Sequence, residues 1–176
     1  MSVGQVRTAA DLNGGSLALY IAPYVPSPPQ VIQRMLVLAG LKAGEVFFDL
    51  GSGDGRTVIM AVKEFGARAV GVELREDLVK KALSTIYEQS LQDRITIVNG
   101  DLFSVDLASA DVVFLYLTTS ANEKVRPKLD SELRRGVRIV SHDYEVIGWK
   151  AVKVENYREN EALGYPSHTL YLYEKP

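Results

Sequence analysis

Five short runs of mostly apolar residues divide the chain between residues 46 and 140. They are Val46–Leu50, Ala69–Glu73, Ile95–Val98, Val112–Leu117 and Val137–Val140. Each is short and largely continuous, which is typical of a strand buried on both faces of a sheet. Strands of this kind occur mainly in parallel sheets, where helices cover both faces.

Segments with helical periodicity separate these runs. We expect helices over Pro28–Ala39, Arg56–Phe65, Leu78–Ser90 and Asn122–Arg135. Ser27 and Asp77 are the predicted N-caps of the first and third helices, and Pro127 is expected to kink or restart the last one. Strand and helix therefore alternate from residue 45 to residue 140, which predicts an α/β fold with a doubly wound parallel sheet.

The two ends of the chain differ from this central part. Val152–Val154 and Thr169–Tyr173 alternate more clearly between apolar and polar positions, which predicts an antiparallel pair at the C-terminus. Residues 1–19 are mostly polar and small and are predicted to form an N-terminal arm. Residues 20–176 are then expected to form a single domain.

Composition narrows the classes of protein that fit. Of the 176 residues 47% are apolar and 24% charged, and the formal net charge is -2, so the chain as a whole lacks the basic character of nucleic-acid enzymes. The absence of cysteine excludes disulfides, thiolate zinc sites and cysteine nucleophiles. With two histidines, His142 and His168, no metal site is expected. We find no signal peptide and no apolar run of about 20 residues, and expect a cytoplasmic monomer without membrane contact.

A glycine-rich turn follows the first apolar run. Gly51-Ser52-Gly53-Asp54-Gly55 comes directly after Asp49, at the end of a predicted strand where such sheets bind their ligands. Without side chains, Gly51 and Gly53 are expected to leave space for a nucleotide-like molecule. The spacing differs from the G-x-G-x-x-G fingerprint of dinucleotide sites, and two carboxylates would repel a pyrophosphate. Asp49 and Asp54 suit a ligand that carries an ammonium group.

Acidic residues also end the next two predicted strands. Glu73 lies about 20 residues beyond the glycines, where a carboxylate accepts hydrogen bonds from ribose hydroxyls. Asp101 follows the third strand and is a candidate acceptor for an adenine amino group. Leu102 and Phe103 are candidates to sandwich the adenine ring, although ordinary core packing explains either of them equally well.

The whole pattern resembles class I methyltransferases that use S-adenosylmethionine (SAM), with Asp49–Gly55, Glu73 and Gly100-Asp101 as successive motifs. Further segments resemble the archaeal broad-specificity protein lysine methyltransferases and their mitochondrial and Dot1 relatives. These segments are Pro23–Pro28, Leu117-Thr118 with Asn122, Pro127–Leu129, Val140–Glu145 and Gly148-Trp149. The resemblance covers about residues 20 to 173. It implies a Rossmann-like class I methyltransferase fold, with a mostly parallel seven-stranded sheet and a C-terminal antiparallel strand.

The resemblance also implies a cofactor, a substrate class and roles for particular residues. The cofactor is SAM, and the substrates are proteins with exposed lysines. The residues expected to bind SAM are Tyr24, Ser27, Asp49, Gly51, Ser52, Gly53, Glu73, Asp101, Leu102, Phe103 and Tyr116. Tyr24, Tyr116 and Thr118 are expected to form the channel for the substrate lysine, whose pKa falls in an apolar environment. His142 is expected to make a structural hydrogen bond rather than to transfer a proton.

Three alternatives stay open. The first is a small-molecule or RNA methyltransferase on the same fold, for which a basic run could supply phosphate contacts; a solvated helix face explains that run as well. The run consists of Lys124, Arg126, Lys128, Arg134, Arg135 and Arg138. The second is a nicotinamide-dependent oxidoreductase, which needs the longer glycine fingerprint. The third is a SAM-binding partner without catalytic activity.

Overall fold

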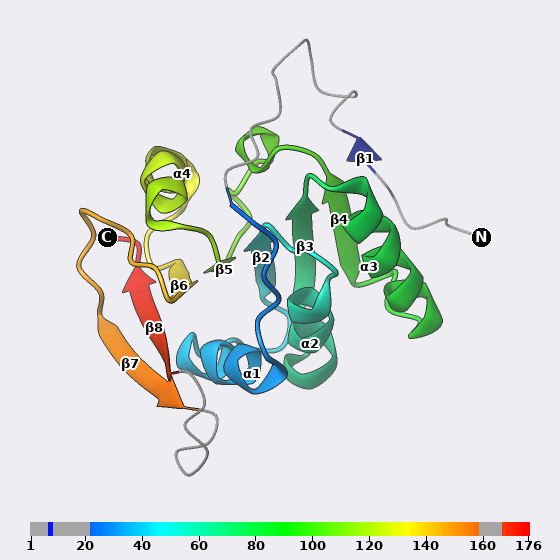
Figure 1. Cartoon of the computed structure of the whole chain (residues 1–176), viewed down its shortest axis with the longest axis horizontal. Coiled ribbons are helices and arrows are strands. Elements are labelled where there is room, and N and C mark those ends of the chain that lie inside the picture. Colours follow the sequence, from blue (N-terminus) through cyan, green and yellow to red (C-terminus); the bar gives the residue numbers. More distant parts are fainter. Residues whose placement is uncertain (1–6, 9–21, 159–166) are drawn as a thin grey trace.

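The computed structural model describes residues 7–8, 22–158 and 167–176, which form one mixed sheet flanked by helices (Figure 1). The strands are β1 (Arg7–Thr8), β2 (Val46–Leu50), β3 (Arg68–Glu73), β4 (Ile95–Asn99), β5 (Val112–Leu115), β6 (Arg138–His142), β7 (Lys153–Arg158) and β8 (Ser167–Glu174). Their order in the sheet is β1-β4-β3-β2-β5-β6-β8-β7. This order confirms the predicted mostly parallel seven-stranded sheet, and the two-residue strand β1 adjoins its β4 edge.

The direction of the strands also follows the prediction. Strands β2 to β6 pair in parallel, and β8 is antiparallel to both of its neighbours, β6 and β7. The parallel strands therefore end at one edge of the sheet, with the segments that carry Asp49, Glu73 and Asp101 side by side. Apart from β1, the predicted arm of residues 1–19 lies outside the described residues.

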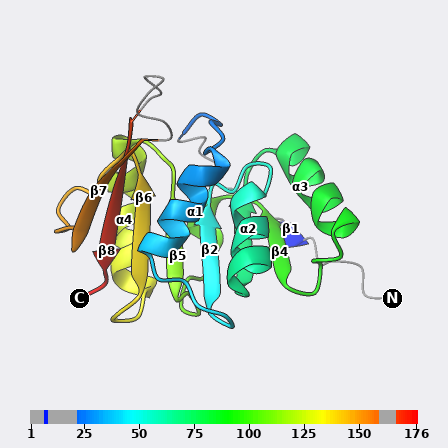
Figure 2. The same ribbon diagram turned by 90° about the horizontal axis from the view of Figure 1, so that it is seen from below.

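Helices cover both faces of the sheet (Figure 2). They are α1 (Pro29–Leu38), α2 (Arg56–Phe65), α3 (Glu76–Glu88) and α4 (Thr119–Glu132), with a 3₁₀ turn, η2, over Leu102–Ser104. Helices α1, α2 and α3 pack on one face of the sheet and α4 packs on the other. Because successive side chains of a strand point to opposite faces, neighbouring residues of one strand belong to different hydrophobic cores. Phe47 lies in the core under α1 and α2, whereas Phe48 lies in the core under α4.

The ends of several elements differ from the prediction, and the differences affect the site. Pro28, not Ser27, is the N-cap of α1, and Arg75, not Asp77, is the N-cap of α3. Helix α4 begins three residues earlier than predicted because the Thr118 hydroxyl accepts a hydrogen bond from the Ala121 amide at 3.2 Å. Strand β5 ends at Leu115, so Tyr116 lies in the connection that follows the strand.

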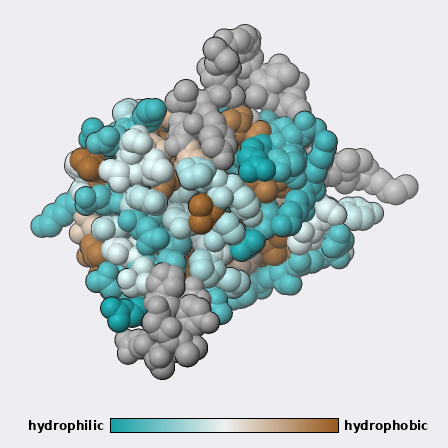
Figure 3. Space-filling model, in the orientation of Figure 1, coloured by the Kyte–Doolittle hydropathy of each residue, from teal (hydrophilic) through white to brown (hydrophobic). Residues whose placement is uncertain are grey.

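The surface offers little continuous apolar area on the face shown in Figure 3, where small hydrophobic patches are separated by hydrophilic residues. Among the described residues, no helix combines the length and the apolar character needed to cross a membrane.

Candidate cofactor and substrate site

A cleft opens at the carboxyl ends of β2, β3 and β4, bounded on its other side by the segment before α1. Ten of the eleven residues predicted to bind the cofactor line this cleft: Tyr24, Ser27, Asp49, Gly51, Ser52, Gly53, Glu73, Asp101, Leu102 and Tyr116. Phe103 is not among the lining residues, and it packs against the core under α4. The structure thus brings together segments that are up to 92 positions apart in the chain, from Tyr24 to Tyr116.

The glycine-rich turn is fixed by backbone hydrogen bonds. The amides of Gly51 and Ser52 both donate to the Val72 carbonyl at 2.9 Å, which ties the turn to β3. Gly51 and Gly53 have φ angles of 96° and 54°, in the left-handed region that only glycine adopts without strain. The turn therefore requires glycine for its backbone conformation before any ligand is considered.

The space above Gly53 is occupied by protein, which corrects the expectation that both glycines leave room for a nucleotide. A Cβ on Gly53 would lie 2.5 Å from Cε2 of Tyr24, and one on Gly51 would lie 3.3 Å from Cδ2 of Leu117. These glycines allow the segment before α1 and the connection after β5 to close over the turn. Two walls of the cleft depend on this close approach.

Glu73, at the end of β3, connects two parts of the cleft. Its Oε2 accepts a hydrogen bond from the Gly53 amide at 2.9 Å, and its Oε1 accepts one from the Arg75 amide at 2.8 Å. The side chain is buried. Each carboxylate oxygen has two lone pairs, so the geometry leaves acceptor capacity on both atoms. Glu73 thus holds the glycine-rich turn in place in addition to its predicted role toward a ribose.

Asp49 is buried at the base of the cleft, with 3% of its surface exposed. Burial raises the pKa of this carboxyl to about 8, and the charges of Glu73 and Asp54 act in the same direction, opposed by a hydrogen bond from Thr57. A positively charged group in the cleft would reverse this shift. The site is therefore electrostatically suited to a cationic ligand.

Asp54 differs from Asp49 because its charge is already compensated. Arg56 forms a salt bridge with it at 2.8 Å and Lys81 one at 3.3 Å. Burial alone would raise the pKa of Asp54, but the hydrogen bonds and charge of Arg56, together with Lys81, bring it well below its ordinary value. Of the two carboxylates expected to suit a cationic ligand, Asp54 is therefore already paired with cations of the chain, whereas Asp49 has no salt bridge among the described residues.

Asp101 lines the cleft beyond the end of β4. Its Oδ1 accepts a hydrogen bond from the Phe103 amide at 2.9 Å and so caps the 3₁₀ turn η2. This cap directs Leu102 toward the cleft, whereas Phe103 faces the core.

Ser27 and Tyr116 meet at His142, which is fully buried at the end of β6. The Ser27 hydroxyl lies 2.9 Å from Nδ1 of His142, and the Tyr116 ring stacks on the imidazole with 3.9 Å between ring centroids. His142 therefore makes the structural hydrogen bond that was expected of it. Its partner is the hydroxyl of Ser27, which was predicted to cap α1 instead. One buried imidazole thus supports two walls of the cleft.

A second, smaller cavity adjoins the cleft. It is lined by Ala22, Pro23, Val25, Tyr116, Leu117, Thr118 and Tyr144. Five residues line both cavities: Ala22, Pro23, Val25, Tyr116 and Leu117. Of the three residues predicted to form the channel for the substrate lysine, Tyr116 and Thr118 line this second cavity, whereas Tyr24 lines the cleft alone.

Sequence reasoning missed several lining residues. Arg56, Thr57, Arg75 and Leu117 all line the cleft. Arg56 and Thr57 directly follow the glycine-rich turn at the start of α2, and Arg75 is two positions after Glu73, so proximity to the motifs was the available signal. Tyr144 lines the second cavity through the loop after β6.

That loop is held by Asn122, a fully buried residue of α4. Its Nδ2 lies 3.1 Å from the Tyr144 carbonyl, 3.2 Å from the Glu145 carbonyl and 3.3 Å from the Ser141 hydroxyl. The Ser141 hydroxyl in turn donates to the Tyr144 carbonyl. The first turn of α4 thereby positions the loop that carries Tyr144.

The strand order, the glycine-rich turn and the buried carboxylate at the strand tips together define a class I SAM-dependent methyltransferase. Residues 49–153 match the family described as the ANTKMT methyltransferase domain, and the chain belongs to this family. S-adenosylmethionine is accordingly its methyl donor, and the cationic preference of the cleft fits that molecule.

Individual relatives cover most of the chain. A protein-lysine N-methyltransferase of Saccharolobus islandicus (strain REY15A) is 42% identical over 155 residues, which are 86% of this chain and 92% of that protein. The adenine nucleotide translocase lysine N-methyltransferase of Mus musculus is 30% identical, and the match covers 83% of this chain but 63% of the mouse protein. A crystal structure of an RNA methyltransferase from Salinibacter ruber with S-adenosyl-L-homocysteine superposes with a TM-score of 0.80. It is 41% identical, and the match covers 86% of this chain and 94% of that one.

Proposed function

We propose that this chain transfers methyl groups from SAM to the side-chain amine of lysines in proteins. Two relatives, one archaeal and one murine, are named as lysine methyltransferases. The structural observation that carries the proposal is the second cavity, which shares Tyr116 and Leu117 with the wall of the cofactor cleft. A largely apolar and aromatic cavity of this kind suits a long aliphatic side chain with an amine at its tip.

The reaction is a displacement at carbon. Bound SAM supplies an electrophilic methyl group on a positively charged sulfur. The neutral lysine nitrogen would form the new bond to carbon with its lone pair while the bond from sulfur to carbon breaks. The electron pair of the broken bond would stay on sulfur, which leaves as the neutral thioether S-adenosyl-L-homocysteine, and the methylated ammonium product would then lose a proton to solvent. The amine must enter without its proton, because an ammonium group has no lone pair.

The residues of the second cavity fit this requirement. Val25, Leu117 and Pro23 present apolar surface, and burial among such residues lowers the pKa of a lysine ammonium group. Tyr116 stands where the two cavities meet, so we assign its ring and hydroxyl to orientation of the amine. The Thr118 hydroxyl already caps α4, and we therefore assign Thr118 to the channel wall rather than to proton transfer.

We assign the cofactor contacts to groups that face the cleft. Asp49 is placed to compensate positive charge, Glu73 and Asp101 offer carboxylate oxygens to hydroxyl and amino groups, and Leu102 offers apolar surface to a ring. Ser27 and Tyr24 bound the opposite side. Phe103 is left out of this assignment because it packs into the core.

RNA methylation is the second candidate, because the similar protein from Salinibacter ruber is named as an RNA methyltransferase. The basic residues around α4 give this candidate limited support. Lys128, Arg134 and Arg138 form salt bridges with Glu132, Asp111 and Glu45 at 2.6, 2.9 and 2.6 Å. Half of the predicted basic run is thus neutralised within the chain.

An acceptor assay decides between the two candidates. Purified protein is incubated with methyl-labelled SAM and a cell lysate, half of which has been treated with ribonuclease. Lysine methylation predicts label on protein bands in both halves and methylated lysine by mass spectrometry. A matched lysate with chemically acetylated lysines serves as the control. Label that disappears with ribonuclease would assign the activity to RNA.

We further propose that the protein acts as a monomer in the cytoplasm on proteins with exposed lysines. The proposal rests on the composition and on the small apolar patches of the face shown in Figure 3. Light scattering of the purified protein and fractionation of the source cells test these two points separately.

A further inference from the structure

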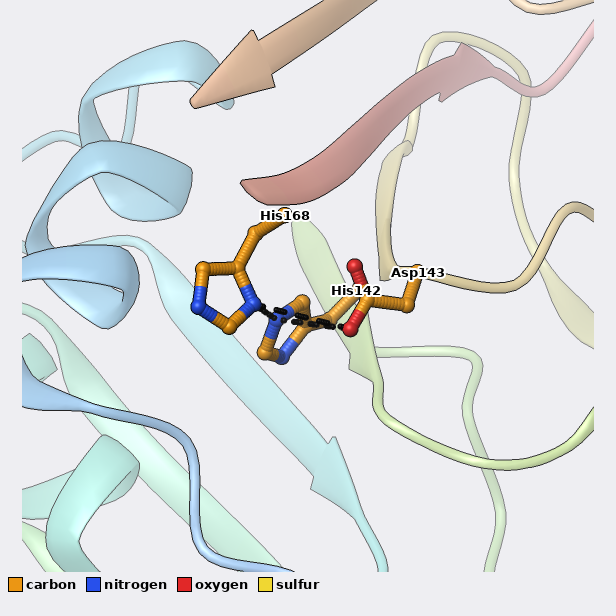
Figure 4. A group of neighbouring side chains, drawn as sticks. All are labelled: His142, Asp143 and His168. Atoms are coloured by element: carbon orange, nitrogen blue, oxygen red, sulfur yellow. Dashed lines mark hydrogen bonds and ion pairs between the residues drawn. The ribbon is translucent and has the colours of Figure 1, made fainter. Parts of the chain in front are cut away.

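The two histidines of the chain lie side by side together with Asp143 (Figure 4). His142 ends β6, Asp143 follows it, and His168 lies near the start of β8, the antiparallel neighbour of β6. Nε2 of His142 is 2.8 Å from Nδ1 of His168, and Oδ2 of Asp143 is 3.4 and 3.5 Å from these two nitrogens. Three potential metal-ligand atoms thus converge on one point.

Other contacts orient each group for this purpose. The Ser27 hydroxyl bonds Nδ1 of His142 at 2.9 Å, which leaves Nε2 directed toward the cluster. Oδ1 of Asp143 accepts a hydrogen bond from the Thr169 amide at 2.9 Å, which leaves Oδ2 directed the same way. Outer hydrogen bonds of this kind are the usual support of metal ligands. Asp143 also has a φ angle of 61°, so the backbone bears strain to present this carboxylate.

The three side chains differ in how far they are buried. His142 is fully buried and His168 is 8% exposed, while Asp143 reaches the surface.

The distances can be compared with a metal site. Ligand atoms at roughly 2.0–2.2 Å from a tetrahedral zinc ion lie about 3.3–3.5 Å from one another. The two distances from Asp143 fall in this range, whereas the two nitrogens are about half an ångström too close. A small rotation of one ring that replaces the hydrogen bond between them corrects this difference.

We propose that His142, Asp143 and His168 form a binding site for a divalent transition-metal ion of the zinc class. Two imidazoles and one carboxylate are a ligand set that such ions accept, and the fourth position is left for water. None of the three residues lines the cofactor cleft or the second cavity. The ion would join β6 to β8 directly behind Tyr116 and Ser27, both of which contact His142.

Cobalt(II) is the probe of choice, because its visible absorption reports the number and geometry of its ligands. The full chain is stripped with a chelator, titrated with cobalt chloride and then with zinc chloride. The proposal predicts one equivalent of cobalt with a tetrahedral-type spectrum, which one equivalent of zinc removes. Because the chain has no cysteine and no other histidine, imidazole ligation can only come from this cluster.

Variants locate the ion. Asp143→Asn and His168→Gln should each weaken cobalt binding by more than about 100-fold, and Ser27→Ala, which removes an outer hydrogen bond, by about 10-fold. Asp93→Asn, in the exposed turn before β4, is the matched control and should leave the titration unchanged. Circular dichroism confirms that each variant is folded.

X-ray absorption of the wild-type cobalt complex gives a test that needs no variant. Two imidazole ligands in that spectrum support the site. The proposal is overturned if the wild type shows no stoichiometric cobalt binding, if fewer than two imidazoles are ligated, or if folded Asp143→Asn and His168→Gln bind as tightly as the wild type. The histidines then form a hydrogen-bonded pair only.

Discussion

The ring of Tyr24 lies against Gly53, so closely that a Cβ on the glycine would stand 2.5 Å from Cε2 of the tyrosine. The two residues come from separate parts of the chain, the proline-rich segment before α1 and the turn after β2. Their contact closes the cofactor cleft on one side. A motif that is usually interpreted as a space for ligand therefore also serves as the docking point of a neighbouring segment.

Gly53→Ala is expected to displace Tyr24 and weaken SAM binding by about 10-fold or more, in addition to a loss of stability of about 1–2 kcal/mol from the left-handed backbone. Calorimetric titration with SAM and chemical denaturation measure the two effects. Gly136→Ala is the matched control, because Gly136 also has a positive φ of 80° but nothing lies within 4 Å of its added Cβ. The control should lose stability without losing SAM affinity.

A double variant separates the clash from the strain. In Gly53→Ala with Tyr24→Ala the ring is removed, so the added methyl group meets no neighbour from that side chain. Cofactor affinity should then equal that of Tyr24→Ala alone. An affinity that falls further in the double variant would show that the methyl group itself blocks the ligand, as the sequence had suggested.

Asp49 is expected to make the stability of the ligand-free protein depend on pH. Its pKa is about 8 in the folded chain and near 4 when unfolded, so the folded state binds the extra proton between these values. The stabilising effect is fully present below pH 4 and is lost as the pH rises to 8. The side chain of Asp49→Asn cannot titrate. The free energy of unfolding of this variant, relative to that of the wild type, should therefore rise between pH 4 and pH 8 and level off above pH 8.

The same substitution should weaken SAM binding by about 1–3 kcal/mol, because the carboxylate that compensates the positive ligand is gone. Denaturation at several pH values and calorimetric titration provide the data, with Asp93→Asn as the exposed control. If the free energies of unfolding of the wild type and of Asp49→Asn change in parallel with pH, Asp49 is ionised throughout this range.

Glu73→Ala should disturb the fold and the cofactor site together. The substitution leaves the amides of Gly53 and Arg75 without their acceptor, at a cost of about 1–3 kcal/mol in stability. SAM affinity should fall by about 10-fold, and added SAM should raise the melting temperature less than in the wild type. Glu64→Ala, on the exposed side of α2, should change neither quantity. If folded Glu73→Ala binds SAM as tightly as the wild type, the Glu73 carboxylate does not contribute to cofactor binding.

The fold and most of the cleft follow from patterns that lie close together in the sequence. The buried strand Val46–Leu50 and the helix Arg56–Phe65 were predicted to the residue, because a continuous apolar run and two glycine boundaries mark their ends. Asp49, Glu73 and Asp101 were found because parallel strands bring their carboxyl ends to one edge of the sheet.

Contacts between distant segments could not be predicted in the same way. Ser27 resembles a helix cap in the sequence, yet its hydroxyl bonds His142, 115 positions later. Asp54 was expected to suit a cationic ligand; it lines the cleft, but its carboxylate is already paired with Arg56 and Lys81. Such pairings depend on how whole elements pack, and local spacing carries no information about them.

Tyr116→Phe is expected to lower turnover while leaving SAM affinity within about twofold, because the ring keeps its stacking on His142 and only the hydroxyl is lost. Burial, with the charges of Asp143 and Tyr144, raises the pKa of this hydroxyl, so it acts in its protonated form at pH 7–9. Steady-state kinetics with a lysine-rich acceptor protein and calorimetry with SAM supply the two numbers. Tyr87→Phe, on the exposed surface of α3, is the control. An equal loss of turnover and SAM affinity would place the Tyr116 hydroxyl against the cofactor instead of the amine, and an unchanged turnover would restrict its role to the ring.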